Sequence, residues 1–209
     1  MPFIPTTTIL SNYAVNISVF CGASLPHNSN YTNAARELGR LIAQGGHTLL
    51  YGGSNLGLMG IVSGRALEYG GRVVGVIPSL FSEEIIRSQP VSKLVRVDSI
   101  AQRKQYLIAH SDAFIALPGG IGTVDETFEV LVSNQLGLIQ KPIGLLDTNH
   151  FYQNLIAQLG HMETEGFYNL TNAGYLILED QPERLLQNLA SYRPTHENKS
   201  ANQRLCNKK

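Results

Sequence analysis

The chain has 209 residues, of which 43% are hydrophobic and 15% are charged, as suits one globular domain with a sizeable core. Sixteen Lys and Arg residues balance sixteen Asp and Glu residues, so no overall field attracts nucleic acid or a membrane surface. Two cysteines, Cys21 and Cys206, are too few for a disulfide framework or a cysteine metal cluster. Neither a secretory signal nor a run of transmembrane length is visible, so we expect a cytoplasmic protein without nucleic-acid or membrane partners.

Strand-like and helical patterns alternate along the chain. Apolar runs predict strands at 17–21, 48–51, 72–77, 94–97, 113–117, 142–147 and 175–178. Helical periodicity falls between them, at 31–44, from the 52–57 loop to about 69, and at 99–110, 124–136, 150–163 and 181–191. The alternation predicts a single Rossmann-like α/β domain with a doubly wound parallel sheet. We place this domain at 16–191, with an N-terminal extension at 1–15 and a disordered polar tail at 192–209.

Three loops rich in small residues follow predicted strands, at 21–24, 52–57 and 118–122. Ligands of such sheets bind beyond the carboxyl ends of the strands, so these loops are expected to outline a pocket. The third loop, Pro-Gly-Gly-Ile-Gly, leads directly into a helix whose first N–H groups can hold a phosphate. The loop at 52–57 matches neither the dinucleotide fingerprint nor a P-loop, and tight packing explains it as well as ligand contact does.

Glu126 lies just inside the helix that follows the third loop. It is a candidate for chemistry on whatever carries the phosphate, but Thr123 and Glu126 also form the T-x-x-E pattern of a capping box. Asp125 points about 100° away from Glu126 around a helix, so Glu129, one turn on, is the better companion for Glu126. Three glycines exceed what a cap alone requires, which favours a ligand site.

Two further groups of charged residues are candidates for the same pocket. Arg103 and Lys104 lie in the first turns of the helix before the 113–117 strand and either bind phosphate and ribose oxygens or remain solvated. Glu84 lies in an irregular segment, where its carboxylate either recognises an amino group on a base or starts a helical turn. The six histidines show no metal-ligand spacing, so no metal site is predicted.

Several of these segments together resemble the Lonely Guy family of cytokinin riboside 5′-monophosphate phosphoribohydrolases, often labelled lysine decarboxylases. The matching segments are VFCGAS at 19–24, YGGSNLGLMG at 51–60, GVIP at 75–78, RK at 103–104 and PGGIGTVDE at 118–126. The resemblance runs from about residue 17 to 189. Two positions depart from the family pattern: Ser54 stands where a third glycine is usual, and Asp125 where Glu is usual.

The resemblance implies roles for individual residues. Arg103 and Glu126 match the catalytic pair, whereas Lys104, Gly119, Gly120, Gly122 and Thr123 match groups around the nucleotide. With Ser24 of the first loop and Glu84 of the irregular segment, they make the set of expected substrate-binding residues.

The expected reaction follows from the same resemblance. It is hydrolysis of an adenine-type nucleoside 5′-monophosphate, either a cytokinin riboside 5′-monophosphate or AMP, to free base and ribose 5-phosphate without a cofactor. The alternative is a non-catalytic nucleotide or molybdenum-cofactor carrier of the same fold. A lysine decarboxylase fits least, because no distinctive lysine context for pyridoxal phosphate is visible. The family resemblance also implies a homo-oligomer, a dimer or larger.

Overall fold

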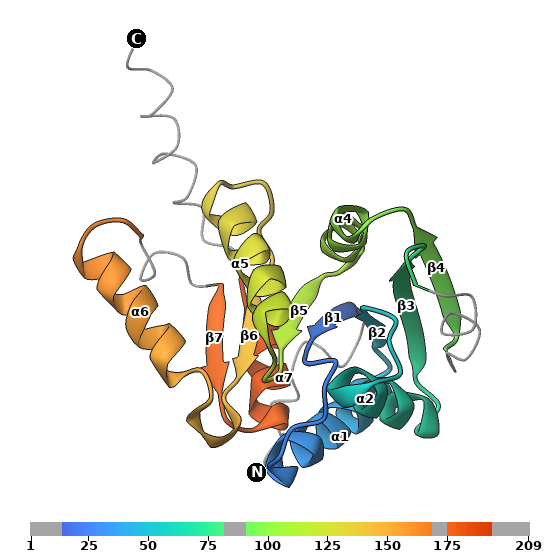
Figure 1. Cartoon of the computed structure of the whole chain (residues 1–209). Coiled ribbons are helices and arrows are strands. Elements are labelled where there is room, and N and C mark those ends of the chain that lie inside the picture. Colours follow the sequence, from blue (N-terminus) through green and yellow to red (C-terminus); the bar gives the residue numbers. More distant parts are fainter. Residues whose placement is uncertain (1–13, 82–90, 169–174, 194–209) are drawn as a thin grey trace, which may run out of the picture.

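The fold is built on one parallel sheet, which a computed structural model describes over residues 14–81, 91–168 and 175–193 (Figure 1). Seven strands pair in the order β4-β3-β2-β1-β5-β6-β7, and every neighbouring pair is parallel. Their bounds are β1 Asn16–Phe20, β2 Thr48–Tyr51, β3 Arg72–Pro78, β4 Lys93–Val97, β5 Ala113–Ala116, β6 Ile143–Leu146 and β7 Leu176–Glu179. The predicted parallel α/β sheet is confirmed.

Helices cover both faces of this sheet. They are α1 Ser29–Gln44, α2 Gly57–Glu68, α4 Ile100–His110, α5 Ile121–Gln135, α6 Gln153–Thr164 and α7 Pro182–Ser191, with a short 3₁₀ turn, η2, at Thr148–His150. One hydrophobic core joins α1, α2 and α7 to the sheet, and a second joins α4, α5 and α6 to its other face. Successive residues of β1 point to opposite faces of the sheet, so Val19 belongs to the first core and Phe20 to the second. The sheet is therefore doubly wound, as expected.

The strand order reverses between β1 and β5. The chain leaves β1 through α1 toward β2, whereas it leaves β5 through α5 toward β6 on the opposite side. The loops that follow β1 and β5 therefore lead away from each other, and a crevice opens beyond the carboxyl ends of these two strands. This topological switch point positions the candidate site.

The observed boundaries differ from the predicted ones by up to three residues. Helix α1 begins at Ser29, because the Asn28 side chain accepts a hydrogen bond from the Asn30 amide and caps the helix two residues early. Helix α6 begins only at Gln153, because the expected start, His150, has a left-handed φ of 56° that a helix cannot contain.

Parts of the expected extension and tail, 1–13 and 194–209, lie outside the described residues, as does 82–90 with Glu84. Among the helices that are described, none combines the length and apolar character needed to cross a bilayer.

Candidate functional site

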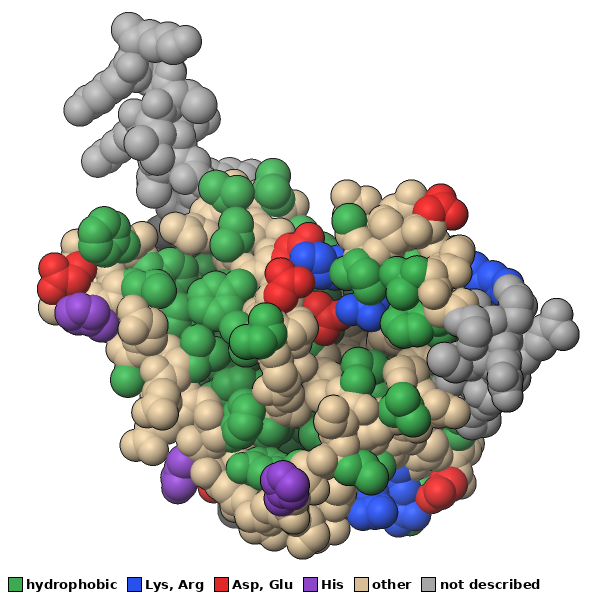
Figure 2. All heavy atoms as spheres, in the orientation of Figure 1, with side chains coloured by type: hydrophobic (Ala, Val, Ile, Leu, Met, Phe, Trp, Pro, Cys, Tyr) green, Lys and Arg blue, Asp and Glu red, His purple; other side chains and the backbone are tan. Residues whose placement is uncertain are grey.

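A cavity of about 400 Å³ opens at the switch point between β1 and β5. It lies beside a hollow between α4 and α5 where acidic and basic side chains meet (Figure 2). The loop after β1, the start of α2, helix α4 and the loop and helix after β5 all contribute to its wall. The lining residues are Cys21, Gly22, Ala23, Ser24, Leu25, Pro26, Tyr31, Leu58, Met59, Arg103, Pro118, Gly119, Gly120, Gly122, Thr123, Glu126 and Phe151.

The loops after β1 and β5 meet at Gly22 and Gly119. The Gly22 amide donates to the Pro118 carbonyl at 3.3 Å. A Cβ added at Gly119 would lie 2.1 Å from Thr123 Oγ1 and 2.8 Å from the Gly22 nitrogen. The second contact is with backbone, which cannot rotate away, so only glycine fits at 119. The two loops thus form one continuous pocket floor.

The N-terminus of α5 faces this pocket without a side-chain cap. Gly120 is the N-cap residue, and no side-chain hydrogen bond caps the helix. Gly120, Gly122 and Thr123 all line the cavity, so the positive end of the helix dipole is directed at it. The capping-box interpretation of Thr123 and Glu126 is therefore wrong: the helix begins at Ile121, and Glu126 lies in its second turn. This arrangement suits an anionic group such as phosphate.

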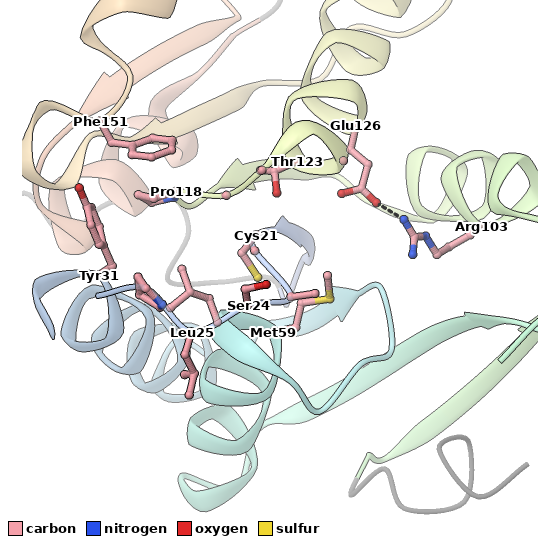
Figure 3. Close-up of a pocket in the computed structure, with 17 residues that line it drawn as sticks. Cys21, Ser24, Leu25, Tyr31, Met59, Arg103, Pro118, Thr123, Glu126 and Phe151 are labelled. Atoms are coloured by element: carbon pink, nitrogen blue, oxygen red, sulfur yellow. Dashed lines mark hydrogen bonds and ion pairs between the residues drawn. The ribbon is translucent and has the colours of Figure 1, made fainter. Parts of the chain in front are cut away.

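Glu126 forms a largely buried ion pair with Arg103. Arg103 Nη2, from α4, lies 2.7 Å from Glu126 Oε1, from α5, and the two side chains are 13% and 6% exposed (Figure 3). Burial raises the pKa of Glu126 above its usual range, and the charge and hydrogen bond of Arg103 oppose that rise. Arg103 Nε is buried without a hydrogen-bond partner, so one donor of the guanidinium remains unused. The pair therefore places a fixed carboxylate and a guanidinium in the pocket wall.

Lys104 lies outside the pocket lining, although it follows Arg103 directly. Its Nζ is 3.0 Å from Asp125 Oδ2 and 2.7 Å from Glu129 Oε2. Glu129, expected as the companion of Glu126, therefore pairs with Lys104 instead. Three ion pairs thus join α4 and α5 in the described part of the chain, and of these the Arg103–Glu126 pair lines the cavity.

The 52–57 loop stands behind the pocket wall. None of its residues lines the cavity, whereas Leu58 and Met59 of α2 do. A Cβ at Gly52 would lie 3.4 Å from Arg103 Nη1, so this part of the loop packs behind the guanidinium. Ser54 Oγ accepts a hydrogen bond from the Leu56 amide at 3.2 Å, so this departure from the family pattern shapes the loop rather than the pocket wall.

An apolar end of the pocket has no motif in the sequence. Leu25, Pro26, Tyr31 and Phe151 line it, and the Tyr31 and Phe151 rings meet edge to face with centroids 5.9 Å apart. Figure 3 shows these two rings at the end opposite the Arg103–Glu126 pair. They come from α1 and from the segment after η2, so only the fold brings them together.

Cys21 is the residue that follows β1. It is buried and also lines the pocket, and burial together with the nearby Glu126 raises the pKa of its thiol. The thiol is therefore neutral at physiological pH. Across the described part of the chain, no three His, Cys, Asp or Glu side chains are grouped so as to hold a metal ion.

Comparison with known proteins identifies the family. A family model described as "Possible lysine decarboxylase" matches residues 59–189. A cytokinin riboside 5′-monophosphate phosphoribohydrolase of Arabidopsis thaliana is 41% identical over 192 residues, 91% of this chain and 87% of the relative. A second Arabidopsis enzyme of that name is 38% identical over 181 residues, 87% of this chain and 85% of the relative. The chain belongs to the Lonely Guy family.

Membership of the Lonely Guy family makes the chain an enzyme, an N-glycosidic hydrolase of the phosphoribohydrolase type. The decarboxylase description of the family model names a different chemistry, one that uses a lysine Schiff base with pyridoxal phosphate. Within the described residues, the pocket is lined by an arginine and a glutamate but by no lysine.

Solved structures share the fold of this Lonely Guy chain. A molybdenum cofactor binding protein from Rippkaea orientalis is 26% identical, with a TM-score of 0.62 over 84% of this chain and 95% of that chain. The molybdenum cofactor carrier protein of Chlamydomonas reinhardtii is 24% identical, with a TM-score of 0.64 over 86% of this chain and 100% of that chain. The second likeness shows the fold alone.

Proposed function

We propose that this enzyme hydrolyses the N-glycosidic bond of an adenine-type nucleoside 5′-monophosphate, releasing free base and ribose 5-phosphate. Cytokinin riboside 5′-monophosphates and AMP are the candidate substrates. The observation that carries the proposal is the buried Arg103–Glu126 pair, which faces the same pocket as the uncapped N-terminus of α5. An anion site and a fixed carboxylate in one cavity suit a nucleotide: the anion site binds its phosphate, and the carboxylate lies beside a ribose that develops positive charge as the bond to the base breaks. The named relatives act on such nucleotides.

In the proposed reaction, the 5′-phosphate binds at the glycine loop and the first turn of α5, contacting Gly119, Gly120, Gly122 and Thr123, with Ser24 across the pocket. Binding energy from this non-reacting group then positions the ribose beside Glu126. As the bond between C1′ and the base nitrogen breaks, positive charge develops on the ribose, and the Glu126 carboxylate stabilises it. Water supplies hydroxide to C1′, and its proton goes to the departing base.

Arg103 has two tasks in this scheme. Its Nη2 holds Glu126 in place, and its guanidinium, which lines the pocket, supplies positive charge beside the substrate. Because the charge and hydrogen bond of Arg103 favour the ionised carboxylate, they oppose the burial that raises the pKa of Glu126. Glu126 therefore enters the reaction as an oriented anion.

The test incubates purified protein separately with isopentenyladenosine monophosphate and with AMP, and separates free base from nucleotide by chromatography. We expect free base and ribose 5-phosphate in equal amounts from at least one nucleotide, and the ratio of kcat/KM values assigns the preference. Release of no base from either, with tight nucleotide binding retained, would contradict hydrolysis and favour the carrier function. Glu126→Gln is the matched control, because it keeps the acceptor for Arg103 but removes the charge.

We also propose that the enzyme is a homo-oligomer, a dimer or larger. Helix α5 and the residues just after it expose the large apolar side chains Ile121, Val132, Leu136 and Leu138, between 47% and 87% accessible. Exposed large apolar side chains gathered on one element are common at protein interfaces. Light scattering after size-exclusion chromatography measures the mass directly. A monomer of 22.9 kDa at micromolar concentration would contradict the proposal.

A further inference from the structure

Two carbonyls at the start of the glycine loop at 118–122 accept hydrogen bonds from other segments of the chain. The Gly22 amide, from the loop after β1, donates to the Pro118 carbonyl at 3.3 Å. The Tyr152 hydroxyl donates to the carbonyl of Leu117, the residue before Pro118, at 2.7 Å. Leu117 and Tyr152 are both buried and lie 35 residues apart in the chain. The second contact therefore joins the glycine loop to the segment before α6.

Tyr152 is itself held from two directions. Asp147, the residue after β6, accepts a hydrogen bond from the Tyr152 amide on its Oδ1 at 2.7 Å. The Tyr152 ring packs with Ala116 of β5 and Leu145 of β6 in a small core of its own. Asp147 thus fixes the backbone of Tyr152 and the two strands fix its ring, so the hydroxyl has a defined direction.

We propose that Tyr152 is a positioning residue for the glycine loop. By holding the Leu117 carbonyl, its hydroxyl sets the direction in which the N–H groups from Gly119 to Thr123 face the 5′-phosphate. The proposal rests on the proposed hydrolase function and adds a residue that acts without touching the substrate. Tyr152 is absent from the pocket lining, whereas its neighbour Phe151 belongs to it.

The hydrogen bond controls the loop because a buried carbonyl cannot turn to water instead. Without the hydroxyl, the Leu117 carbonyl loses this partner inside the protein, which costs more than the loss of a bond at the surface. Relief requires a rotation of the peptide that leads into the loop. Two residues later, Gly119 lies so close to Gly22 that an added Cβ would come within 2.8 Å of the Gly22 nitrogen. A fit this tight transmits the rotation to the amides that follow, and anion binding depends on their direction.

The Tyr152 hydroxyl is a constant donor. Burial raises the pKa of this hydroxyl, so it stays protonated at physiological pH. The Leu117 carbonyl can only accept a hydrogen bond, so the direction of the contact is fixed as well. The support of the loop is therefore independent of pH, and its loss should weaken phosphate binding without moving the pH profile of the reaction.

The test measures the binding of ribose 5-phosphate by calorimetry to wild type, Tyr152→Phe and a matched control, Tyr175→Phe. Tyr175 is also 2% exposed and its hydroxyl lies 3.1 Å from that of Tyr168, but it precedes β7, at the end of the sheet remote from the pocket. Both variants lose a buried hydroxyl and should melt at a lower temperature. We expect Kd to rise about tenfold in Tyr152→Phe and to stay within about twofold of wild type in Tyr175→Phe. With nucleotide substrate, KM should rise more than kcat falls.

A second pair of variants tests how Tyr152 is held. Asp147→Asn keeps an oxygen that accepts from the Tyr152 amide, so it should bind ribose 5-phosphate within about twofold of wild type. Asp147→Ala removes the acceptor and should weaken binding at least about threefold. This pair decides the question where Tyr152→Phe does not fold, and equal affinities in the two Asp147 variants would then overturn the proposal.

Two results for the tyrosine variants would overturn the assignment. One is a Kd of Tyr152→Phe within about twofold of wild type. The other is an equal loss of affinity in Tyr175→Phe, because that would be a general effect of lower stability. A wild-type protein that binds ribose 5-phosphate but releases no base contradicts the hydrolase function alone, since the binding comparison still tests Tyr152. A wild-type protein that does not bind ribose 5-phosphate overturns the phosphate role of the loop and this proposal with it.

Discussion

Breaking the Arg103–Glu126 pair one partner at a time tests whether this contact serves catalysis, stability or both. Glu126→Gln keeps an acceptor oxygen for Arg103 Nη2 but removes the negative charge. Arg103→Met keeps the volume of the aliphatic stem but leaves a carboxylate that is only 6% exposed without its cation. The double variant Arg103→Met/Glu126→Gln removes both charges.

The expected loss of unfolding free energy follows from the burial of the Arg103–Glu126 pair and from the distance between its charges. Two unit charges about 4 Å apart interact by about 4 kcal/mol at an effective dielectric constant of about 20. Breaking a buried pair from one side costs about 3–5 kcal/mol, because the remaining charge stays buried. We expect Arg103→Met to lose about 3 kcal/mol of unfolding free energy, and the double variant to lose less than the sum of the two single changes. Glu126→Gln should lower kcat by about 10²–10⁴-fold with nucleotide binding retained.

The direction in which the free energy of unfolding changes with pH follows from the pKa of Glu126. Burial raises the pKa of Glu126 in the folded protein, and Arg103→Met removes the charge that opposes that rise. A carboxyl with a raised folded-state pKa binds more protons when folded, so its contribution to stability falls as pH rises from the unfolded toward the folded pKa. Arg103→Met should therefore be closest to wild type near pH 4 to 5 and weakest, relative to wild type, at pH 8.

The assays are urea unfolding at several pH values and steady-state turnover of the preferred nucleotide. In the proposed reaction Glu126 acts as an oriented anion whose charge stabilises the ribose. A Glu126→Gln variant with kcat within about threefold of wild type would refute it. Equal destabilisation of Arg103→Met at pH 5 and pH 8 would show that the buried carboxylate does not titrate as described.

Other expectations concern packing around the site. Gly60→Ala should cost several kcal/mol, because the new Cβ would lie 2.0 Å from the Asn55 carbonyl oxygen, whereas Gly64→Ala in the same helix meets nothing within 4 Å and should add about 0.5–1 kcal/mol. The two melting temperatures check this, and a Gly60→Ala protein as stable as Gly64→Ala would contradict it. Asn134→Ala should cost about 2–4 kcal/mol, since buried Asn134 bonds both the N–H and the C=O of Lys141. Urea unfolding measures that loss, and a change below about 0.5 kcal/mol would show that water replaces the side chain.

The sequence was most informative about elements governed by local periodicity. Buried parallel strands appear as short continuous apolar runs, and glycines between runs and helices mark the turns, so the strands and the sheet type could be predicted. Helix starts were less predictable, because they depend on caps and backbone angles. Helix α5 begins at Ile121 on an uncapped glycine, and η2 precedes α6 because Asn149 and His150 adopt positive φ.

For the candidate site, the linear pattern indicated the loop and the two helices but not the pairing between them. Whether Glu129 or Arg103 meets Glu126 depends on how α4 and α5 pack on one face of the sheet, which no spacing within either helix determines. The same holds for Lys104, whose partners are about twenty residues away. The Tyr31–Phe151 contact joins residues on α1 and after η2 and has no local signal at all.

The sequence by itself determined the alternating architecture, the position of the glycine loop at 118–122 and the presence of a carboxylate and an arginine in the elements next to it, because each depends on contiguous residues. Only the tertiary structure decided which charges pair, which of them face the cavity and which aromatic rings close its far end. Those contacts arise where the strand order reverses between β1 and β5, and they join segments that are distant in the chain. Long-range packing sets their geometry, so local residue preferences alone do not encode it.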